Sequence, residues 1–339
     1  MSIPSYPSSS TSDSDSESGP DCLRSPSPNG LRTATAVKCV YENLKSRVAR
    51  SEALKKRNLP SDSIEILSKL GSGAFGEVHK AKYNNEQLVA VKTFYRGKYA
   101  DPKIEKQMIK KFRKEAILLN EVSHVNILGF IGWLDDPFRL VTELCPGDSL
   151  YTHLHVKEMP ARIEFTIEQT IAFATQIAAG MSHLHSKGVI HRDLKSSNIF
   201  LSDDLTVKIG DFGAAEVRTR WTDGRGCDML TGSVLWMAPE IIRIQKYNTH
   251  SQASDVYAYG VVLYELYTGK IPYADITNCA DQIIYLVGSG QLRPNFRESL
   301  KYSDLPESLI LMAESCCKTK TDDRPNFERV LELLQQAGI

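Results

Sequence analysis

Residues 191–198 read His-Arg-Asp-Leu-Lys-Ser-Ser-Asn, and residues 211–213 read Asp-Phe-Gly. These two stretches decide the fold, because they gather groups of different chemistry into one short segment of the chain. Asp193 is a candidate general base that can accept the proton of a substrate hydroxyl. Lys195 can neutralise negative charge on a group in transfer.

The same segment also offers ligands for a metal ion. Asn198 supplies an amide oxygen and Asp211 a carboxylate, and both suit a hard cation such as Mg2+. The alternative is a polar loop beside two short strands, 199–201 and 207–209, with no chemistry at all. That alternative requires both motifs to be accidental, so we interpret the segment as the site of phosphoryl transfer.

Length and composition bound the class of protein. The chain has 339 residues, 42% hydrophobic and 24% charged, which is enough for one large or two modest domains. The 41 basic and 41 acidic residues balance, so no overall field favours nucleic acid or an anionic membrane. The seven cysteines lack disulfide or zinc-ligand spacing, as is typical of a reducing compartment. Neither a signal-peptide pattern nor a run of about 18 apolar residues is found, so we expect a cytoplasmic protein without a membrane span.

The composition also divides the chain into parts. Residues 1–34 are rich in Ser, Pro and Asp and are predicted to be disordered, because they cannot bury enough apolar surface to offset their conformational entropy. Residues 35–62 are predicted to be a basic amphipathic helix or a linker. Residues 63–339 are predicted to form the folded domain.

The folded domain changes character along its length. Short β-rich runs and one helix come first, and mostly helical periodicity follows. The predicted strands are 64–70, 77–83, 88–94, 127–134 and 138–141, and the predicted helices are 103–121, 167–186, 254–268, 279–289, 306–316 and 326–336. This order predicts an α+β, two-lobed architecture with a small N-lobe (63–142), a hinge (143–147) and a larger C-lobe (148–339).

A glycine-rich stretch, Gly71-Ser-Gly-Ala-Phe-Gly-Glu-Val78, precedes the helix of the first lobe. Glycines let the backbone approach phosphates and offer N–H donors. A Rossmann turn is the alternative, but its glycines open a helix, whereas here both flanks have strand character. The predicted nucleotide-binding residues of this stretch are Gly71, Ser72, Gly73, Ala74, Phe75, Gly76 and Val78.

Lys92 ends the apolar run Val89-Ala-Val-Lys92 and is well placed to reach the α- and β-phosphates of a nucleotide. A lysine in a partly dry cleft needs a fixed counter-charge. Glu115 lies on the predicted helix 103–121 beside an apolar face, whereas the competing acids Glu105 and Glu121 lack that setting. We therefore predict an ion pair between Lys92 and Glu115.

From about residue 63 to 337, the chain resembles the eukaryotic protein kinases. The resemblance implies the bilobal kinase fold, with ATP and Mg2+ as cofactors. It also implies three structural contacts: an ion pair between Glu240 and Arg324, a brace of the catalytic loop by Asp255, and a bridging hydroxyl at Ser233. Lys195-Ser-Ser-Asn198 is similar to the catalytic loop of serine/threonine kinases.

The resemblance assigns further residues to the adenine site. Val78, Ala90 and Phe200 would lie above and below the adenine ring. Thr142 would be the gatekeeper, and the backbone of Glu143 and Cys145 would offer hinge groups. A hydrophobic column that links both lobes would consist of Leu119, Phe130, His191 and Phe212.

A narrower resemblance, to the Raf family, covers most of the second lobe. It rests on Asn198–Gly213, Arg220-Trp221, Gly232–Glu240 and Tyr264–Gly269, and on shorter matches at His124–Leu128 and Asp281–Ile284. It implies that the substrate protein is a MAP kinase kinase, phosphorylated on activation-loop serines. An upstream activating kinase is a further expected partner, with Thr219, Thr222 and Thr231 as candidate phosphosites.

The chain departs from the Raf pattern at positions that bear on assembly and regulation. Asn120-Glu-Val-Ser123 replaces a basic stretch, and Arg57 stands where that family has a Trp, so Raf-type dimerisation stays open. Glu216 replaces a phosphorylatable Thr. Its carboxylate either partly imitates a phosphate or is an ordinary solvated group, and the sequence leaves both interpretations open.

Two other functions compete with an active kinase. A pseudokinase or scaffold would bind ATP or a partner kinase with little catalysis, but it would be expected to show degraded motifs. Lys92, Asp193, Asn198 and Asp211 are all present. A nucleotide-binding protein that is not a kinase would need the catalytic loop to be coincidental. The sequence therefore favours a serine/threonine kinase.

Overall fold

The computed structural model describes residue 52 and residues 55–337, with gaps at 74–75, 95–101, 157–162, 215, 218–232, 244–249 and 275–279. The predicted tail, 1–34, and most of the predicted helix or linker, 35–62, lie outside the described residues. Among those described, no helix is long and apolar enough to cross a membrane.

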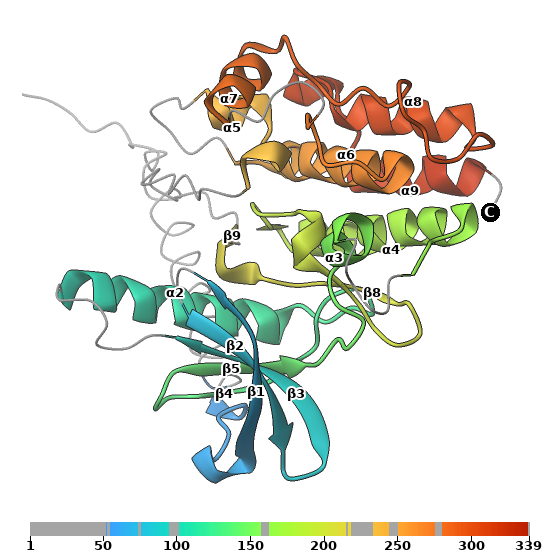
Figure 1. Cartoon of the computed structure of the whole chain (residues 1–339). Coiled ribbons are helices and arrows are strands. Elements are labelled where there is room, and N and C mark those ends of the chain that lie inside the picture. The colour runs from blue at the N-terminus through green and yellow to red at the C-terminus, as the bar shows by residue number, and fades with distance from the viewer. Residues whose placement is uncertain are drawn as a thin grey trace, which may run out of the picture. The chain divides into compact units, whose positions relative to one another are not determined.

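The first part of the domain is an antiparallel sheet with one helix beside it (Figure 1). Its strands are β1 (Ile64–Gly73), β2 (Gly76–Tyr83), β3 (Gln87–Phe94), β4 (Phe130–Leu134) and β5 (Arg139–Glu143), in the order β1-β2-β3-β5-β4. Strand β3 buries Val89 and Val91, while Ala90 and Lys92 are half-exposed on the opposite face. Helix α2 (Pro102–Glu121) buries Phe112 in one core with Phe94 of β3 and Leu140 of β5, whereas Val89 and Val91 belong to a second cluster.

The second part is mainly helical. Its helices are α3 (Leu150–His155), α4 (Ile167–Ser186), α5 (Pro239–Ile242), α6 (Gln252–Thr268), α7 (Ala280–Ser289), α8 (Glu307–Cys316) and α9 (Phe327–Gln336). Helix α6 is buried from Ser254 to Thr268 and packs against α4 and α8 (Figure 1). It ends at Gly269, whose φ of 68° suits a residue without a Cβ atom. The fold is therefore the α+β, two-lobed architecture that the sequence predicts.

Short elements between the lobes carry the motif residues. Strands β7 (Ile199–Leu201) and β8 (Val207–Ile209) form a hairpin, and β6 (Val189–Ile190) pairs with β9 (Glu216–Val217). Three 3-10 turns lie among them: η2 (Ser196–Asn198), η3 (Phe212–Ala214) and η4 (Val234–Trp236). The C-lobe thus presents its polar motifs on turns held by buried strands and helices.

One predicted strand is shorter than the apolar run suggests. The prediction was 127–134, but β4 begins at Phe130. The residues before it turn away to pair with β8, since the Leu128 N–H donates to the Ile209 carbonyl at 2.9 Å and the Ile209 N–H to Asn126 at 2.9 Å. Tertiary pairing with the C-lobe therefore overrides the local pattern here.

The outer edge of β4 is covered by the chain that leads into the domain. The Trp133 N–H donates to the Arg57 carbonyl at 2.9 Å, and the Leu59 N–H donates to the Trp133 carbonyl at 2.8 Å. Gly132 permits this approach, because a Cβ there would lie 2.6 Å from the Arg57 carbonyl oxygen. These residues belong to the end of the predicted linker.

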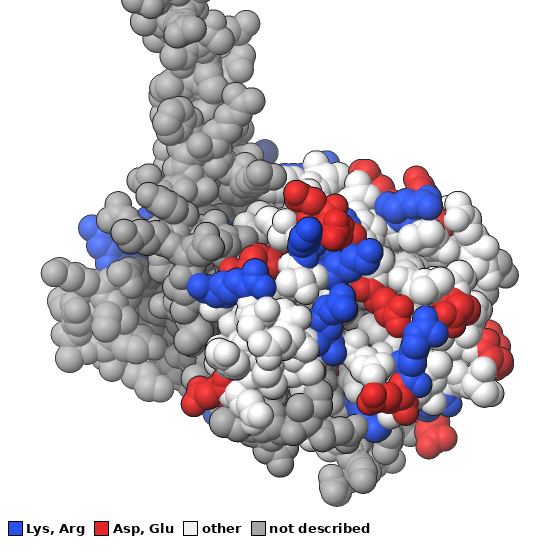
Figure 2. Space-filling model, turned by 90° about the horizontal axis from the view of Figure 1, so that it is seen from above, with Lys and Arg blue, Asp and Glu red and all other residues white. Residues whose placement is uncertain are grey.

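Charges on the described surface are mixed in sign. Seen from above, Lys and Arg side chains alternate with Asp and Glu rather than forming a patch of one sign (Figure 2). This face agrees with the zero net charge of the sequence.

Candidate active site

Lys92 lies at the centre of a charged cluster between the two lobes. Its Nζ donates to Glu115 Oε1 at 2.8 Å and to Asp211 Oδ1 at 2.9 Å. The three residues come from β3, α2 and the turn before η3, so the cluster joins three separate parts of the chain. Glu115 is 5% exposed, whereas the Asp211 side chain is 45% exposed. Asp211 therefore faces the open side of the cluster.

Burial and pairing shift the protonation of this cluster. Burial opposes the charge of Lys92, but the carboxylates of Glu115 and Asp211 outweigh it and raise the lysine pKa above its ordinary value. The positive charge of Lys92 lowers the pKa of Asp211 against the effect of burial. Burial raises the pKa of Glu115, and Lys92 offsets this only in part. Lys92 and Asp211 are thus charged at neutral pH.

The glycine-rich stretch forms the hairpin between β1 and β2. Gly71, Ser72 and Gly73 end β1, Gly76 begins β2, and Ala74 and Phe75 lie outside the described residues. A Cβ on Gly76 would lie 2.1 Å from the Thr93 carbonyl oxygen, so only glycine fits there. A Cβ on Gly71 would meet nothing within 4 Å. Gly71 therefore borders open space.

The predicted adenine residues come from both lobes. Val78 is paired with Lys92 across β2 and β3, and Ala90 is paired with Thr142 across β3 and β5. Phe200 lies on β7, where its ring approaches Gly210 so closely that a Cβ there would lie 2.9 Å away. Val78, Ala90 and Phe200 are half-buried and Thr142 is 9% exposed. These positions suit an apolar slot that a flat ring can enter.

The predicted hinge, 143–147, is tied to its surroundings by a side chain as well as by the backbone. The Glu143 N–H donates to the Gly129 carbonyl at 2.9 Å, and Glu143 Oε1 accepts from the Gly129 N–H at 2.6 Å. Lys208 Nζ lies 3.0 Å from the same oxygen.

Burial and then the Glu143 charge raise the pKa of Cys145 to about 12, so its thiol stays protonated at neutral pH.

The catalytic loop brings its three predicted side chains into contact. Asp193 Oδ2 lies 3.0 Å from Lys195 Nζ and accepts from Asn198 Nδ2 at 3.1 Å. Lys195 also donates to the Ser233 hydroxyl at 2.7 Å, which is the lysine side of the bridge that the family resemblance implies. The amide nitrogen of Asn198 is thus directed at Asp193, and its oxygen remains for a cation.

Asp255 holds the loop from below. Its carboxylate accepts the N–H groups of His191 at 2.8 Å and Arg192 at 2.9 Å, and His185 Nε2 lies 2.9 Å away. Burial alone would raise the pKa of Asp255, but these donors lower it below the ordinary value. Arg192 has a φ of 70° and Asp211 a φ of 58°, conformations that non-glycine residues rarely adopt. The Asp255 contacts stabilise the first of them.

Two more contacts implied by the resemblance are present. Arg324 donates to both carboxylate oxygens of Glu240, at 2.7 and 2.8 Å. The rings of His191 and Phe212 lie 5.1 Å apart. Glu216 belongs to β9, but its side chain lies outside the described residues.

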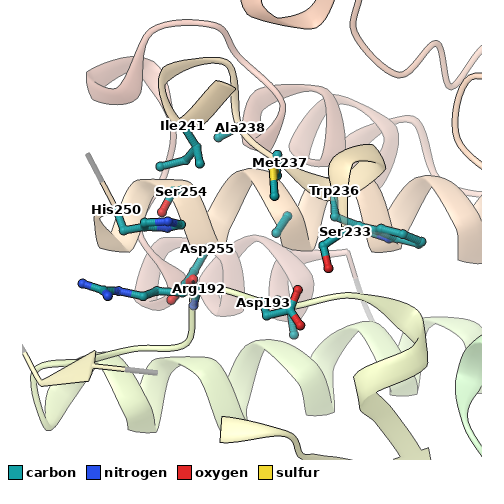
Figure 3. Close-up of a pocket in the computed structure, with 12 residues that line it drawn as sticks. Arg192, Asp193, Ser233, Trp236, Met237, Ala238, Ile241, His250, Ser254 and Asp255 are labelled. Carbon is teal, nitrogen blue, oxygen red and sulfur yellow. Dashed lines mark hydrogen bonds between the residues drawn. The ribbon is translucent and has the colours of Figure 1, made fainter. Parts of the chain in front are cut away.

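A pocket opens beside Asp193. Asp193, Ser233, Trp236, Met237 and His250 are among its lining residues. Figure 3 shows the Asp193 carboxylate beside the Ser233 hydroxyl, and both groups contact Lys195 Nζ. Lys92, Glu115 and Asp211 are not among the lining residues of the pocket, so it is separate from the Lys92 cluster.

The donor set fits ATP and Mg2+. Within the described residues no group of three or more His, Cys, Asp and Glu could hold a metal by itself. Mg2+ characteristically uses one or two protein oxygens together with phosphate oxygens and water, and Asn198 and Asp211 supply such a pair. Lys92 and the open hairpin at Gly71 suit the phosphates.

Sequence reasoning missed Glu265, which lies at the heart of the C-lobe. It is fully buried and accepts hydrogen bonds from Ser196 and Trp236, with His155 also in contact. A signal was available, because an acid within the apolar run Val261-Val-Leu-Tyr-Glu265-Leu-Tyr must find partners once the helix is buried. His185, which contacts Asp255, was missed for lack of any comparable signal.

Comparisons with known proteins agree with the geometry. A family model described as protein tyrosine and serine/threonine kinase matches residues 64–334. The serine/threonine-protein kinase A-Raf of Homo sapiens is 45% identical over 283 residues. This match covers 82% of the chain but 44% of A-Raf, so it spans less than half of the relative's length. The resemblance to the Raf family is thereby confirmed.

Proposed function

Because the chain belongs to the protein tyrosine and serine/threonine kinase family, we propose that it is a Raf-like serine/threonine protein kinase that uses ATP and Mg2+. One observation carries the proposal. Asp193, Lys195 and Asn198 form one contact cluster on the catalytic loop, while Lys92, Glu115 and Asp211 form a second on the nucleotide side. Phosphoryl transfer needs both clusters at once.

The geometry of Asp193 suggests how the hydroxyl would be oriented. Lys195 and Asn198 both reach Oδ2, and no donor reaches Oδ1 from the described part of the chain. Oδ1 would therefore accept the proton of a serine or threonine hydroxyl. Lys195, held by Ser233, would lie beside the phosphoryl group in transfer and stabilise its charge.

On the nucleotide side, Lys92 would bind the α- and β-phosphates while Glu115 keeps its ammonium group in place. Asn198 and Asp211 would hold Mg2+, which supplies positive charge to the phosphates when bound. Val78, Ala90, Thr142 and Phe200 would enclose the adenine, and the backbone of Glu143 and Cys145 would offer it hydrogen bonds. The protein's contribution is positioning and electrostatics, without a covalent intermediate.

The substrate and setting are further parts of the proposal. The similarity to A-Raf and the Raf-type motifs support a MAP kinase kinase as the phosphate acceptor. An upstream kinase that acts on the activation segment would be a second partner, and the cytoplasm the expected location. Neither nucleic acid nor a membrane span is part of the proposed function.

The direct test is phosphate transfer by the full chain. Purified protein is incubated with labelled ATP, Mg2+ and a panel of catalytically inactive MAP kinase kinases, and the phosphorylated residues are identified. Asp193→Asn is expected to lower the rate at least about a hundredfold, because it removes the base. Lys92→Met and removal of Mg2+ by EDTA are expected to abolish detectable transfer. Equal signals from the wild type and both variants would contradict the enzyme and leave a scaffold as the alternative.

A further inference from the structure

A buried carboxylate lies beneath the catalytic loop and outside the residues assigned to the reaction. Glu265, on α6, is 0% exposed. Its Oε1 accepts the Ser196 hydroxyl at 2.6 Å and lies 2.9 Å from His155 Nε2, while its Oε2 accepts the Trp236 indole N–H at 2.7 Å. The three partners belong to η2, α3 and η4. The Glu265 side chain thus joins its own helix, α6, to three elements that are distant in sequence.

The contacts of Glu265 close a ring. Ser196 follows Lys195 directly, and Lys195 donates to the Ser233 hydroxyl at 2.7 Å. Ser233 precedes η4, where the backbone N–H of Trp236 donates to the Ser233 carbonyl at 3.1 Å. Trp236 returns to Glu265. The catalytic loop and the segment that lines the pocket are therefore linked twice, once through Lys195 and once through Glu265.

We infer that Glu265 is a positioning residue, which fixes Lys195 and the Trp236 wall of the pocket relative to one another. The inference rests on the proposed kinase function. Burying a carboxylate costs free energy unless its hydrogen-bond donors stay in place. If Ser196 and Trp236 moved apart, the buried carboxylate of Glu265 would lose a donor. The two loops consequently behave as one unit.

The position of the ring predicts which kinetic constants depend on it. Lys195 and the pocket serve the phosphoryl group and the protein substrate, whereas Lys92, the glycine hairpin and the hinge serve the nucleotide. Loosening the ring should therefore lower kcat and raise the KM for the protein substrate. The KM for ATP should stay unchanged.

Three variants probe the ring. Trp236→Phe keeps the aromatic ring but removes the N–H, and Ser196→Ala removes the hydroxyl. Glu265→Gln is the conservative rescue, because its oxygen can accept from Trp236 while its amide N–H groups face Ser196 and His155, both of which can also accept. Tyr259→Phe is the matched control. It also removes one buried hydrogen bond of α6, to the Ala174 carbonyl of α4 at 3.0 Å, which is not among the contacts of Glu265.

The experiment measures steady-state kinetics of each full-length variant with a catalytically inactive MAP kinase kinase, together with amide hydrogen exchange of residues 196–201. Trp236→Phe and Ser196→Ala are expected to lower kcat/KM for the protein at least about tenfold, equivalent to about 1.4 kcal/mol. They should speed exchange by a similar factor and leave the KM for ATP unchanged. Glu265→Gln should retain most of the wild-type rate.

If Trp236→Phe behaves like Tyr259→Phe in both measurements, the inference is overturned. Failure of the proposed function has a different signature. In that case the wild type transfers no phosphate, and the exchange measurement alone still decides whether Glu265 holds the loop.

Discussion

Two ion pairs of nearly equal length, one in each lobe, have opposite surroundings. Lys92 Nζ lies 2.8 Å from Glu115, and Arg324 Nη1 lies 2.7 Å from Glu240. The Arg324 side chain is completely shielded, donates to three backbone carbonyl groups as well and lies over the Tyr257 ring. Lys92 is 24% exposed and shared between two carboxylates, and Glu115 Oε2 has no partner among the described residues.

The difference separates a charge that holds the fold from a charge that is available to a ligand. Arg324 has its donors satisfied from several directions, so its position is over-determined. The Lys92 cluster contains an exposed carboxylate at Asp211 and an oxygen of Glu115 without a partner among the described residues, so under the proposed function it still has room for contacts with a nucleotide and a metal ion. Four predictions test this contrast.

The largest expected effect is at Arg324. Arg324→Met should lower the free energy of unfolding by about 3–5 kcal/mol, because it leaves Glu240 and three carbonyl groups without their donor. Lys92→Met should cost clearly less, since Glu115, whose pKa burial already raises, can take up a proton. Urea denaturation of both variants measures the two losses. Equal losses of unfolding free energy in the two variants would contradict the difference between the two ion pairs.

The second prediction concerns Asp255. Asp255→Asn should lower the free energy of unfolding by about 3 kcal/mol at neutral pH. An Asn side chain has only one accepting oxygen, so part of the donors that Asp255 satisfies would be left without an acceptor. The folded-state pKa of Asp255 lies below its unfolded value of about 3.9, so its contribution is complete above that pH and is lost as the pH falls through the folded pKa. The gap between wild type and variant should therefore be constant from pH 5 to 8 and shrink below about pH 4. A gap that widens in acid would contradict the assignment.

How far the sequence predicts this molecule depends on the range of the interactions. The helix that carries Glu115 was predicted because Phe112, Ala116 and Leu119 repeat at helical spacing, and this local pattern also gave the correct partner for Lys92. The start of β4 at Phe130 was not predicted, because the Leu128 N–H donates to Ile209 of β8, which belongs to the other lobe. Glu265 was missed for the same reason, since its partners come from three distant elements.

The third prediction separates two glycines of the β1–β2 hairpin. Gly76→Ala should lower the melting temperature, with a cost of about 1–3 kcal/mol, because its Cβ would collide with the Thr93 carbonyl. Gly71→Ala should leave the melting temperature of the nucleotide-free protein unchanged, since nothing lies within 4 Å. With ATP and Mg2+ present, the thermal shift on binding should be smaller for Gly71→Ala than for wild type. An unchanged shift would show that the nucleotide does not approach this glycine.

The smallest effect is expected at the predicted hinge, for the ion pair between Lys208 and Glu143. Lys208 and Glu143 are 16% and 32% exposed, so Lys208→Met should cost at most about 1 kcal/mol. The loss should diminish in 1 M NaCl, because salt screens a pair that water can reach. Chemical denaturation at two salt concentrations measures it. A large loss that is insensitive to salt would place this pair with Arg324 instead.

The cover over β4 has a practical consequence for recombinant work. Arg57 and Leu59 occupy the backbone groups of an outermost strand that would otherwise be free to recruit a second molecule. A truncated protein that begins at Ser61 keeps every predicted strand, yet it leaves this edge bare and should self-associate on concentration. A protein that begins at Lys55 retains the shield and should remain monodisperse.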